Sequence, residues 1–329
     1  MNKLDINGFH LITAFLEPLE IKRLGICSKQ NNEICKYFMT YSYNENGHDE
    51  NCTKMKNIKW VVKDCDRNML HDILNKQLNM SSIIFLRNFN EPIDALSNCT
   101  QLEQLTFGSN FKQPINILSN CVQLQQLTFR WGFNQPINAL SNCTQLEQLS
   151  FRGNFDQRID SLSNCTQLQQ LTVAYRFNQP IEALSKCTQL QQLTFGVMFN
   201  QPTDALSKCT QLQRLTFGRV FNQPIDALSK CTQLQQLTFG VMFNQPIDAL
   251  SNCARLEQLT FGCEFDQPID ALSNCTQLQQ LTFGWVFNQS TRALSNCTQL
   301  KKIVFHKKMS NDINILQDSL PNLTVEYLF

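Results

Sequence analysis

This sequence has little charge and few of the residues that carry enzyme chemistry. Only 17% of its 329 residues are Asp, Glu, Lys or Arg, and they balance to a net charge of +1. A nearly neutral chain lacks the field that steers proteins toward nucleic acids or acidic membranes. Its histidines have no neighbours typical of a metal site or catalytic triad, and no Gly-rich phosphate-binding motif follows a predicted strand. We therefore expect a non-enzymatic protein without catalytic residues, cofactor or metal.

Long apolar runs are also missing. No stretch approaches the roughly 20 apolar residues that cross a bilayer. The N-terminal residues lack the charged start, apolar centre and small-residue cleavage site of a signal peptide. We expect an intracellular, cytoplasmic protein that binds no membrane.

Cysteine is abundant, but its spacing is not that of a disulfide framework. Ten of the 15 cysteines recur at one fixed interval from Cys99 to Cys297, and the other five form no C-x-x-C pair. Equivalent side chains in a stack point in parallel, and a reducing compartment disfavours disulfides. We expect buried free thiols that pack as small apolar groups.

The chain is organised around one 22-residue repeat. The pattern Leu-x-x-Leu-x-Phe begins at Leu102 and returns at this constant interval up to Phe283, with Val173 as the one exception. If its first Leu is position 0, apolar residues recur at positions 0, 3, 5, 9, 13, 16 and 19. A fixed period of this length indicates a solenoid, in which each repeat covers the apolar face of its neighbour.

Each repeat predicts one strand and one helical turn. The alternation in Leu-x-Phe predicts a short strand with one buried face, and stacked copies would form a parallel sheet. Gly commonly follows at position 6 and permits a turn. The phrase Phe-Asn-Gln-Pro-Ile-Asp-Ala-Leu then predicts a short helical or 3-10 segment on the convex side, capped by the Asn or Asp before Pro. The Asn and Gln at positions 10 and 11 either bond between copies as a ladder or are solvated turn residues.

The repeats define the expected domain boundaries. About ten repeats fill residues 80–310, preceded by a linker and N-terminal cap at 46–79 that includes a strand in Asn57–Val62. Residues 311–329 are expected to form a C-terminal cap. There Leu320, Leu323 and Val325 resemble positions 0, 3 and 5 about two residues early.

Residues 1–45 do not repeat and predict a small helical domain. Asp5–Leu16, Leu19–Ser28 and Asn31–Phe38 each place apolar residues at helical spacing, and Pro18 separates the first two. The segment Leu11–Lys29 resembles an F-box, with an apolar helix ending in Leu, a Pro at the turn and a Leu-rich helix ending in Cys-Ser-Lys. Leu4-Asp5 stands where that motif usually opens with Leu-Pro.

The F-box resemblance implies docking on the adaptor subunit of a cullin–RING ubiquitin ligase. The residues implied in docking are Leu11, Ile12, Phe15, Leu16, Pro18, Leu19 and Leu24. The alternative is that the helices only cap the solenoid.

The repeat itself resembles the FNIP repeat, a relative of the leucine-rich repeat, over about residues 80–310. The phrase Phe-Asn-Gln-Pro-Ile carries this resemblance, whereas Leu-Ser-Asn-Cys-Thr looks more like a cysteine-containing leucine-rich repeat. An F-box in front of FNIP repeats is an arrangement of amoebae and large DNA viruses. Together the resemblances imply an α/β repeat solenoid, with parallel strands on the concave face, short helical or 3-10 segments on the convex face and a small N-terminal α-helical domain.

Positions 6, 7 and 8, just after the strand, vary strongly while the core positions hardly vary. Because Trp, Tyr and Arg commonly anchor interfaces, we predict that a protein partner binds along this edge. The predicted partner-binding residues are Arg130, Trp131, Arg152, Tyr175, Arg176, Met198, Arg219, Met242 and Trp285. The valines at 197, 220, 241 and 286 extend the apolar part of this edge. The alternative is drift at an exposed edge that binds nothing.

The main functional hypothesis is a monomeric substrate-recognition adaptor of a cullin–RING ligase, whose repeats hold a target protein. The alternative is a repeat scaffold that binds a protein partner with no ligase link. Nucleic-acid binding is a weaker hypothesis, because Arg130, Arg152 and Arg176 align but the chain lacks a long basic stripe.

Overall fold

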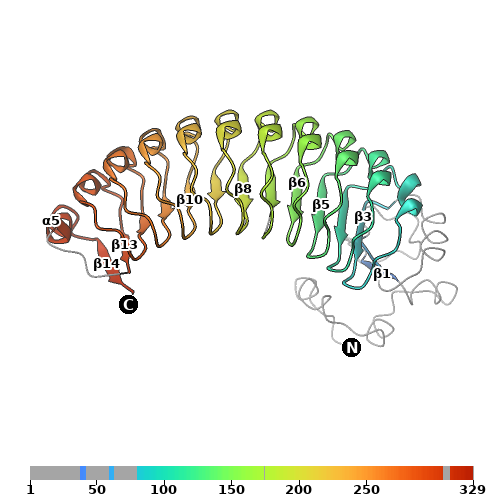
Figure 1. The fold of residues 1–329 in the computed structure, drawn as a ribbon, viewed down its shortest axis with the longest axis horizontal. Coiled ribbons are helices and arrows are strands. Elements are labelled where there is room, and N and C mark those ends of the chain that lie inside the picture. The colour runs from blue at the N-terminus through green and yellow to red at the C-terminus, as the bar shows by residue number, and fades with distance from the viewer. Residues whose placement is uncertain (1–37, 42–58, 63–79, 174, 307–311, 329) are drawn as a thin grey trace, which may run out of the picture.

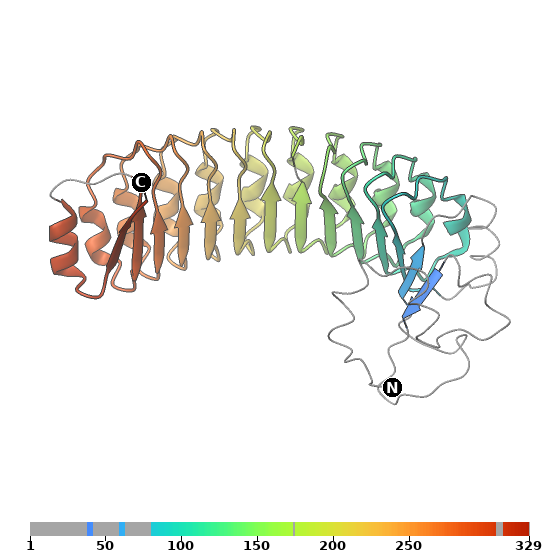
Figure 2. The same cartoon turned by 90° about the horizontal axis from the view of Figure 1, so that it is seen from below.

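The repeats form one curved solenoid. The computed structural model describes residues 38–41, 59–62, 80–173, 175–306 and 312–328. Within these residues, 14 strands form a single sheet in chain order from β1 to β14. Figure 1 shows an arc with the strands along its inner side and the helices along its outer side, and Figure 2 shows the row of strands in front of the helices. The predicted solenoid with a concave parallel sheet is therefore confirmed.

The strands and helices follow the 22-residue period. The strands are β1 Phe38–Tyr41, β2 Lys59–Val62, β3 Ser82–Phe85, β4 Gln104–Phe107, β5 Gln126–Phe129, β6 Gln148–Phe151, β7 Gln170–Val173, β8 Gln192–Phe195, β9 Arg214–Thr216, β10 Gln236–Thr238, β11 Gln258–Thr260, β12 Gln280–Thr282, β13 Lys302–Phe305 and β14 Thr324–Tyr327. In the described residues, the 3-10 helices are η3 Asp94–Asn98, η4 Asn116–Asn120, η5 Asn138–Asn142, η6 Asp160–Asn164, η7 Glu182–Lys186, η8 Asp204–Lys208, η9 Asp226–Lys230, η10 Asp248–Asn252, η11 Asp270–Asn274 and η12 Arg292–Asn296, and the α-helix α5 spans Asp312–Ser319.

The sheet register puts each repeat residue beside its own copy. Leu105 pairs with Leu127 and Phe107 with Phe129 in the parallel β4–β5 pair, and the same 22-residue offset holds from β3 to β14. Along each strand the Leu and Phe are buried while the Gln and Thr face the concave surface. The concave face is consequently a nearly uniform polar surface with little charge.

Stacked phenylalanine rings run through the core and account for its curvature. Rings at position 5 lie 5.1–5.7 Å apart between neighbouring repeats, whereas rings at position 9 lie 6.0–6.1 Å apart. Within a repeat the two rings stack on each other, as in Phe107 and Phe111 at 3.9 Å. Because the repeats are closer together on the strand side, the stack fans outward toward the helices and the sheet becomes concave.

The convex segments are 3-10 helices, but they are not capped as predicted. Their N-cap residue is the buried Ile at position 13, or Thr203 and Thr291 in two repeats, and no side chain caps the helix. The Asn and Asp residues before the Pro are engaged instead in bonds to the next repeat, described below. Acidic residues such as Asp94 and Asp204 do occupy the first turn, where the helix dipole favours negative charge.

At the two ends of the sheet, the register of β14 and the secondary structure at Phe38 differ from what the sequence predicted. Val325 pairs with Ile303 and Tyr327 with Phe305, so β14 keeps the 22-residue offset and the expected early placement of this repeat is wrong. The strand expected in Asn57–Val62 is present as β2, parallel to β3. β1 begins at Phe38, where the third helix was expected to end, and runs antiparallel to β2. The F-box-like segment and its docking residues, Leu11 to Leu24, lie outside the described residues.

Candidate partner-binding ridge

The turns after the strands form a continuous border of the solenoid, which we call the turn ridge. It consists of positions 7 and 8 of the nine repeats that begin at Leu102 through Leu278, together with Arg130 and Arg152 at position 6. Its members at positions 7 and 8 are Ser109, Asn110, Trp131, Gly132, Gly153, Asn154, Tyr175, Arg176, Val197, Met198, Arg219, Val220, Val241, Met242, Cys263, Glu264, Trp285 and Val286.

Hydrogen bonds between neighbouring repeats hold the ridge backbone in register. The N–H group at position 8 donates to the carbonyl oxygen at position 7 of the previous repeat in seven turns, from Asn110 (to Arg87, 3.0 Å) to Val286 (to Cys263, 3.1 Å). Met198, which donates to Tyr175 at 3.0 Å, belongs to this series. In seven of its nine turns the ridge therefore has a backbone tied to the previous repeat, and Gly132 and Arg176 do not make this bond.

A second ladder fixes the chain directly after the ridge. The Asn178 side-chain oxygen accepts the Asn200 N–H at 2.9 Å and the Gln201 side-chain amide at 3.1 Å. Equivalent bonds to a backbone N–H link seven further pairs of repeats, with Asp156 and Asp266 in the acceptor role at two of them. This confirms the ladder alternative over solvated turn residues. Lys112 interrupts the ladder, because its ammonium group cannot accept a hydrogen bond.

Position 6 is glycine in most repeats because the backbones approach too closely for a side chain. A Cβ atom on Gly240 would overlap the carbonyl oxygen of Gly218 and lie 2.7 Å from the Cα atom of Arg219. The same overlap occurs at the glycines 108, 218, 262 and 284. A side chain at position 6 thus requires a different turn.

Two neighbouring repeats have that different turn. Arg130 and Arg152 occupy position 6, and the Arg152 N–H donates to the Phe129 carbonyl at 2.9 Å, as the Gly196 N–H does to the Val173 carbonyl at 2.7 Å in a glycine repeat. In the second of them, the close approach has moved to position 7, where a Cβ atom on Gly153 would overlap the Trp131 backbone. Arg152 is therefore accompanied by a glycine at position 7, whereas the repeat of Arg130 has its glycine at position 8, where a Cβ atom on Gly132 would lie 2.5 Å from the Ser109 carbonyl oxygen.

The predicted partner-binding residues lie on the ridge with exposed side chains. Trp131 is 58% exposed, Tyr175 48%, Met198 45%, Met242 48% and Trp285 51%. The arginines at 130, 152, 176 and 219 are exposed as well. Since β5, β6 and β7 are adjacent strands, the residues from Arg130 to Arg176 lie on three consecutive turns.

The apolar part of the ridge is less uniform than the sequence indicated. The valines at 197, 220 and 241 are half-buried, while Met198, Met242 and Val286 are exposed. His306 also lies on this border, since the period assigns it to position 6 of the next repeat, and it was not among the predicted binding residues. Its ring lies 5.6 Å from that of Trp285, with the ring planes 34° apart. Trp285 is consequently flanked by an ionisable ring.

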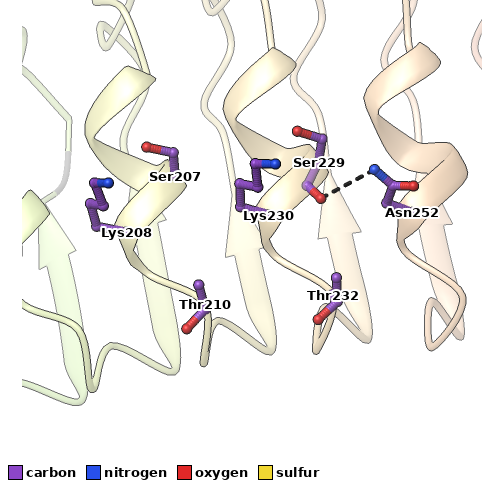
Figure 3. A pocket seen from close by; sticks show the side chains of 7 residues that line it. All are labelled: Ser207, Lys208, Thr210, Ser229, Lys230, Thr232 and Asn252. Atoms are coloured by element: carbon purple, nitrogen blue, oxygen red, sulfur yellow. Dashed lines mark hydrogen bonds between the residues drawn. The ribbon is translucent and has the colours of Figure 1, made fainter.

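A shallow polar groove lies among the 3-10 helices, away from the ridge. Its lining is Ser207, Lys208, Thr210, Ser229, Lys230, Thr232 and Asn252 (Figure 3). Both serine hydroxyls donate to backbone carbonyls within their own helices, and the Asn252 amide donates to the Ser229 carbonyl at 3.3 Å. The groove therefore offers two lysines and two threonines on a solvated surface, and no nucleophile paired with a base.

The ten cysteines at position 19 of the repeats are structural. All ten are free and buried, as predicted, and most donate an S–H to a leucine carbonyl of the previous repeat, as Cys187 does to Leu162 at 3.4 Å. Burial raises the pKa of each thiol from 9.0 to about 11 or 12, as with Cys187 at about 12. A thiol with so high a pKa is a poor nucleophile at neutral pH.

The described residues contain neither a cluster of metal ligands nor a membrane-spanning helix. Within them, no group of three or more His, Cys, Asp or Glu side chains is placed to hold a metal ion. No helix in the described part of the chain is long and apolar enough to cross a membrane.

The sequence matches the profile of one repeat family. The profile described as BspA type leucine rich repeat region matches in six copies, over residues 75–181, 180–267 and 226–318. No curated protein matches the chain.

Solved structures share the architecture. An internalin of Listeria monocytogenes has a TM-score of 0.59 at 20% identity, covering 79% of this chain and 86% of the internalin. Toll, in its Drosophila complex with Spätzle, has a TM-score of 0.58 at 13% identity, covering 83% of this chain and 43% of that one. CroV588, a circular leucine-rich-repeat protein, has a TM-score of 0.53 at 28% identity, and the match covers 76% of this chain and 40% of CroV588. The similarity extends over the solenoid and shows its fold.

Proposed function

The chain belongs to the family of BspA-type leucine-rich repeats, and from this premise we propose that it binds a protein partner along its turn ridge. Leucine-rich-repeat proteins generally mediate protein–protein interaction, as Toll does in its complex with Spätzle. The contact surface would be centred on the three turns that carry Arg130, Trp131, Arg152, Tyr175 and Arg176. Exposed Trp, Tyr and Arg side chains on a fixed backbone are typical of interface anchors.

The observation that carries the proposal is the altered turn at Arg130 and Arg152. Drift at an unused edge would change exposed side chains one at a time without changing the backbone. Here the residue that permits the close approach, Gly153, has moved in step with the arginine before it. A coordinated change of turn that presents charged and aromatic side chains supports a binding role over drift.

The groove lysines provide a matched control for testing this role. The double variant Arg130→Glu/Arg152→Glu and the double variant Lys208→Glu/Lys230→Glu each reverse two charges in successive repeats, the first on the ridge and the second among the helices. The tagged full-length chain and both variants would be expressed in a eukaryotic cell, cross-linked and purified, and their circular dichroism compared to confirm folding. A protein that co-purifies with the wild type and the groove variant, and is lost only from the ridge variant, supports the proposal. Partners lost only from the groove variant would contradict it.

A finer version of this function is a substrate-recognition adaptor of a cullin–RING ubiquitin ligase. It is supported by the resemblance of Leu11–Lys29 to an F-box and of the repeated Phe-Asn-Gln-Pro-Ile phrase to FNIP repeats. In this version the ridge holds the target, and Leu11, Ile12, Phe15, Leu16, Pro18, Leu19 and Leu24 contact the ligase adaptor. Binding raises the local concentration of the target at the ligase, and the chain itself does no chemistry. A cytoplasmic location is part of this version, in keeping with ten free thiols in one stack.

Substitutions in the full-length chain test the adaptor version separately from the ridge. Leu16→Asp/Leu19→Asp is expected to abolish co-purification of ligase subunits while the ridge partner is retained. If ligase subunits are absent from the wild type under conditions that capture the ridge partner, the chain is a binding scaffold without a ligase link.

A further inference from the structure

The side chains of the turn ridge change from cationic to mainly apolar along its length. The turns of the repeats that begin at Leu124, Leu146 and Leu168 carry Arg130, Arg152 and Arg176, and these three guanidinium groups have no ion-pair partner among the described residues. The next three turns carry Val197, Met198, Arg219, Val220, Val241 and Met242. A cationic stretch is therefore followed by a mainly apolar one on the same line.

The ridge period is close to the two-residue repeat of an extended chain. The ridge lies between two rows of phenylalanines, whose ring centroids are 5.3–5.7 Å apart at position 5 and 6.0–6.1 Å apart at position 9 from one repeat to the next. Alternate side chains of an extended segment point to the same side and are about 6.4–6.8 Å apart. Every second side chain of such a segment would therefore meet successive turns, and about 11 residues would reach from Arg130 to Met242.

Recognition along the ridge has to use side chains. Between Asn110 and Val286, seven of the nine position-8 N–H groups already bond to the position-7 carbonyl of the previous repeat, so the backbone offers few groups to an added strand. The arc of the solenoid (Figure 1) also disfavours a long straight helix, because a helix would follow only a few turns of a curved line. An extended segment bends with little cost and can follow all of them.

Resting on the protein-binding function proposed above, we propose that the ridge takes one extended segment of its partner, with one side chain in every two meeting a turn. Alternate carboxylates of the segment face Arg130, Arg152 and Arg176, and alternate apolar side chains face the stretch from Val197 to Met242. Arginine forms bidentate bonds with carboxylates, and the concave face beside the ridge has too little charge to oppose an acidic ligand. Tyr175 and Met198, on adjacent turns, mark the boundary between the two halves.

Two synthetic peptides of equal length and composition test this inference. The block peptide has glutamate at its first, third and fifth positions, valine at its seventh, ninth and eleventh, and serine between them. The alternating peptide has the same three glutamates and three valines, but they alternate over the odd-numbered positions, and serine again stands between them. Fluorescence anisotropy with the full chain is expected to show at least tenfold tighter binding of the block peptide, weakening as salt is raised.

A charge exchange identifies the contact. Arg152→Glu is expected to weaken the block peptide at least tenfold, and a block peptide with lysine at its third position is expected to restore binding to that variant only. Equal binding of the two peptides, or indifference to Arg152→Glu, would overturn the extended-segment inference.

The two levels of the proposal fail in different ways. If neither peptide binds but Arg130→Glu/Arg152→Glu still loses its protein partner, the protein-binding function stands and the partner is recognised through another shape. If that variant keeps every partner of the wild type, the ridge function itself is wrong, and the inference is wrong with it.

Discussion

Replacing Gly240 with alanine is the most direct test of the turn geometry on which the proposed interface rests. The new Cβ atom would overlap the Gly218 carbonyl and lie 2.7 Å from the Arg219 Cα atom, where ordinary contact needs about 3.4 Å or more. Because the new atom would lie 2.0 Å from the Gly218 carbonyl oxygen, the two repeats must separate by about 1 Å or more at a turn tied by the Met242-to-Arg219 hydrogen bond of 2.9 Å. We expect Gly240→Ala to lower the free energy of unfolding by about 2–3 kcal/mol. Roughly 1 kcal/mol of this comes from the weakened hydrogen bond, and the remainder from backbone strain.

The matched control places alanine at the same repeat position of another copy. Arg152 already has a Cβ atom there, so Arg152→Ala is expected to cost about 0.5 kcal/mol or less. Urea unfolding of both variants, followed by circular dichroism, measures the difference, and hydrogen exchange of the Met242 amide reports the local opening. Equal costs for the two substitutions would refute the claim that the turns differ, and with it the main support for the binding ridge.

Three further predictions follow from the packing of the stack. Asn178→Ala removes the acceptor of the Asn200 N–H and should lower the free energy of unfolding by about 1–2 kcal/mol. Asn178→Asp should be nearly neutral, because Asp156 accepts the equivalent bond in another repeat, and urea titration separates the two variants. The Thr291 hydroxyl is buried without a hydrogen bond, so Thr291→Val should stabilise the protein by about 1 kcal/mol. Thr203→Val removes a 3.2 Å hydrogen bond to the Pro224 carbonyl and should not stabilise it. Thermal melting that ranks the two variants in the opposite order would contradict this account. The pKa of the buried thiols is raised from 9.0 to about 11 or 12, so their stabilising effect is complete below pH 9 and is lost as the pH rises toward 12, by up to about 1.4 kcal/mol per pH unit for each thiol; an unfolding midpoint that does not move between pH 8 and pH 10.5 would disprove this.

The sequence predicted the interior of the solenoid well because burial repeats with the chain. Every Leu and Phe at positions 0, 3, 5 and 9 from Leu102 to Phe287 is buried, as is Val173, the one exception to the pattern. The cysteines were correctly expected to be buried thiols for the same reason. An apolar residue at a fixed period has one face of the stack to occupy, so its place can be read from spacing alone.

The sequence was less informative about the borders and ends. It placed the Asn residues before Pro as helix caps, whereas they bond to the next repeat, and it placed β14 too early in the register. Both errors concern polar or marginally apolar residues whose partners lie one repeat away. The partner of such a residue depends on the distance between repeats, which the sequence pattern does not contain.

For the candidate site too, the sequence predicted some features and only the structure revealed others. The variability of positions 6 to 8 identified Arg130, Trp131, Arg152, Tyr175 and Arg176 as neighbours, because the period alone puts them on consecutive turns. That Arg152 is accommodated by a shift of the glycine to position 7 could not be seen without the structure. The number of repeats, the buried face and the order of side chains along the ridge were thus determined by the sequence, since each depends only on a residue's place in the period. The type of turn, the hydrogen-bonded ladders and the curvature were decided by the tertiary structure, because each depends on how closely two neighbouring repeats can pack.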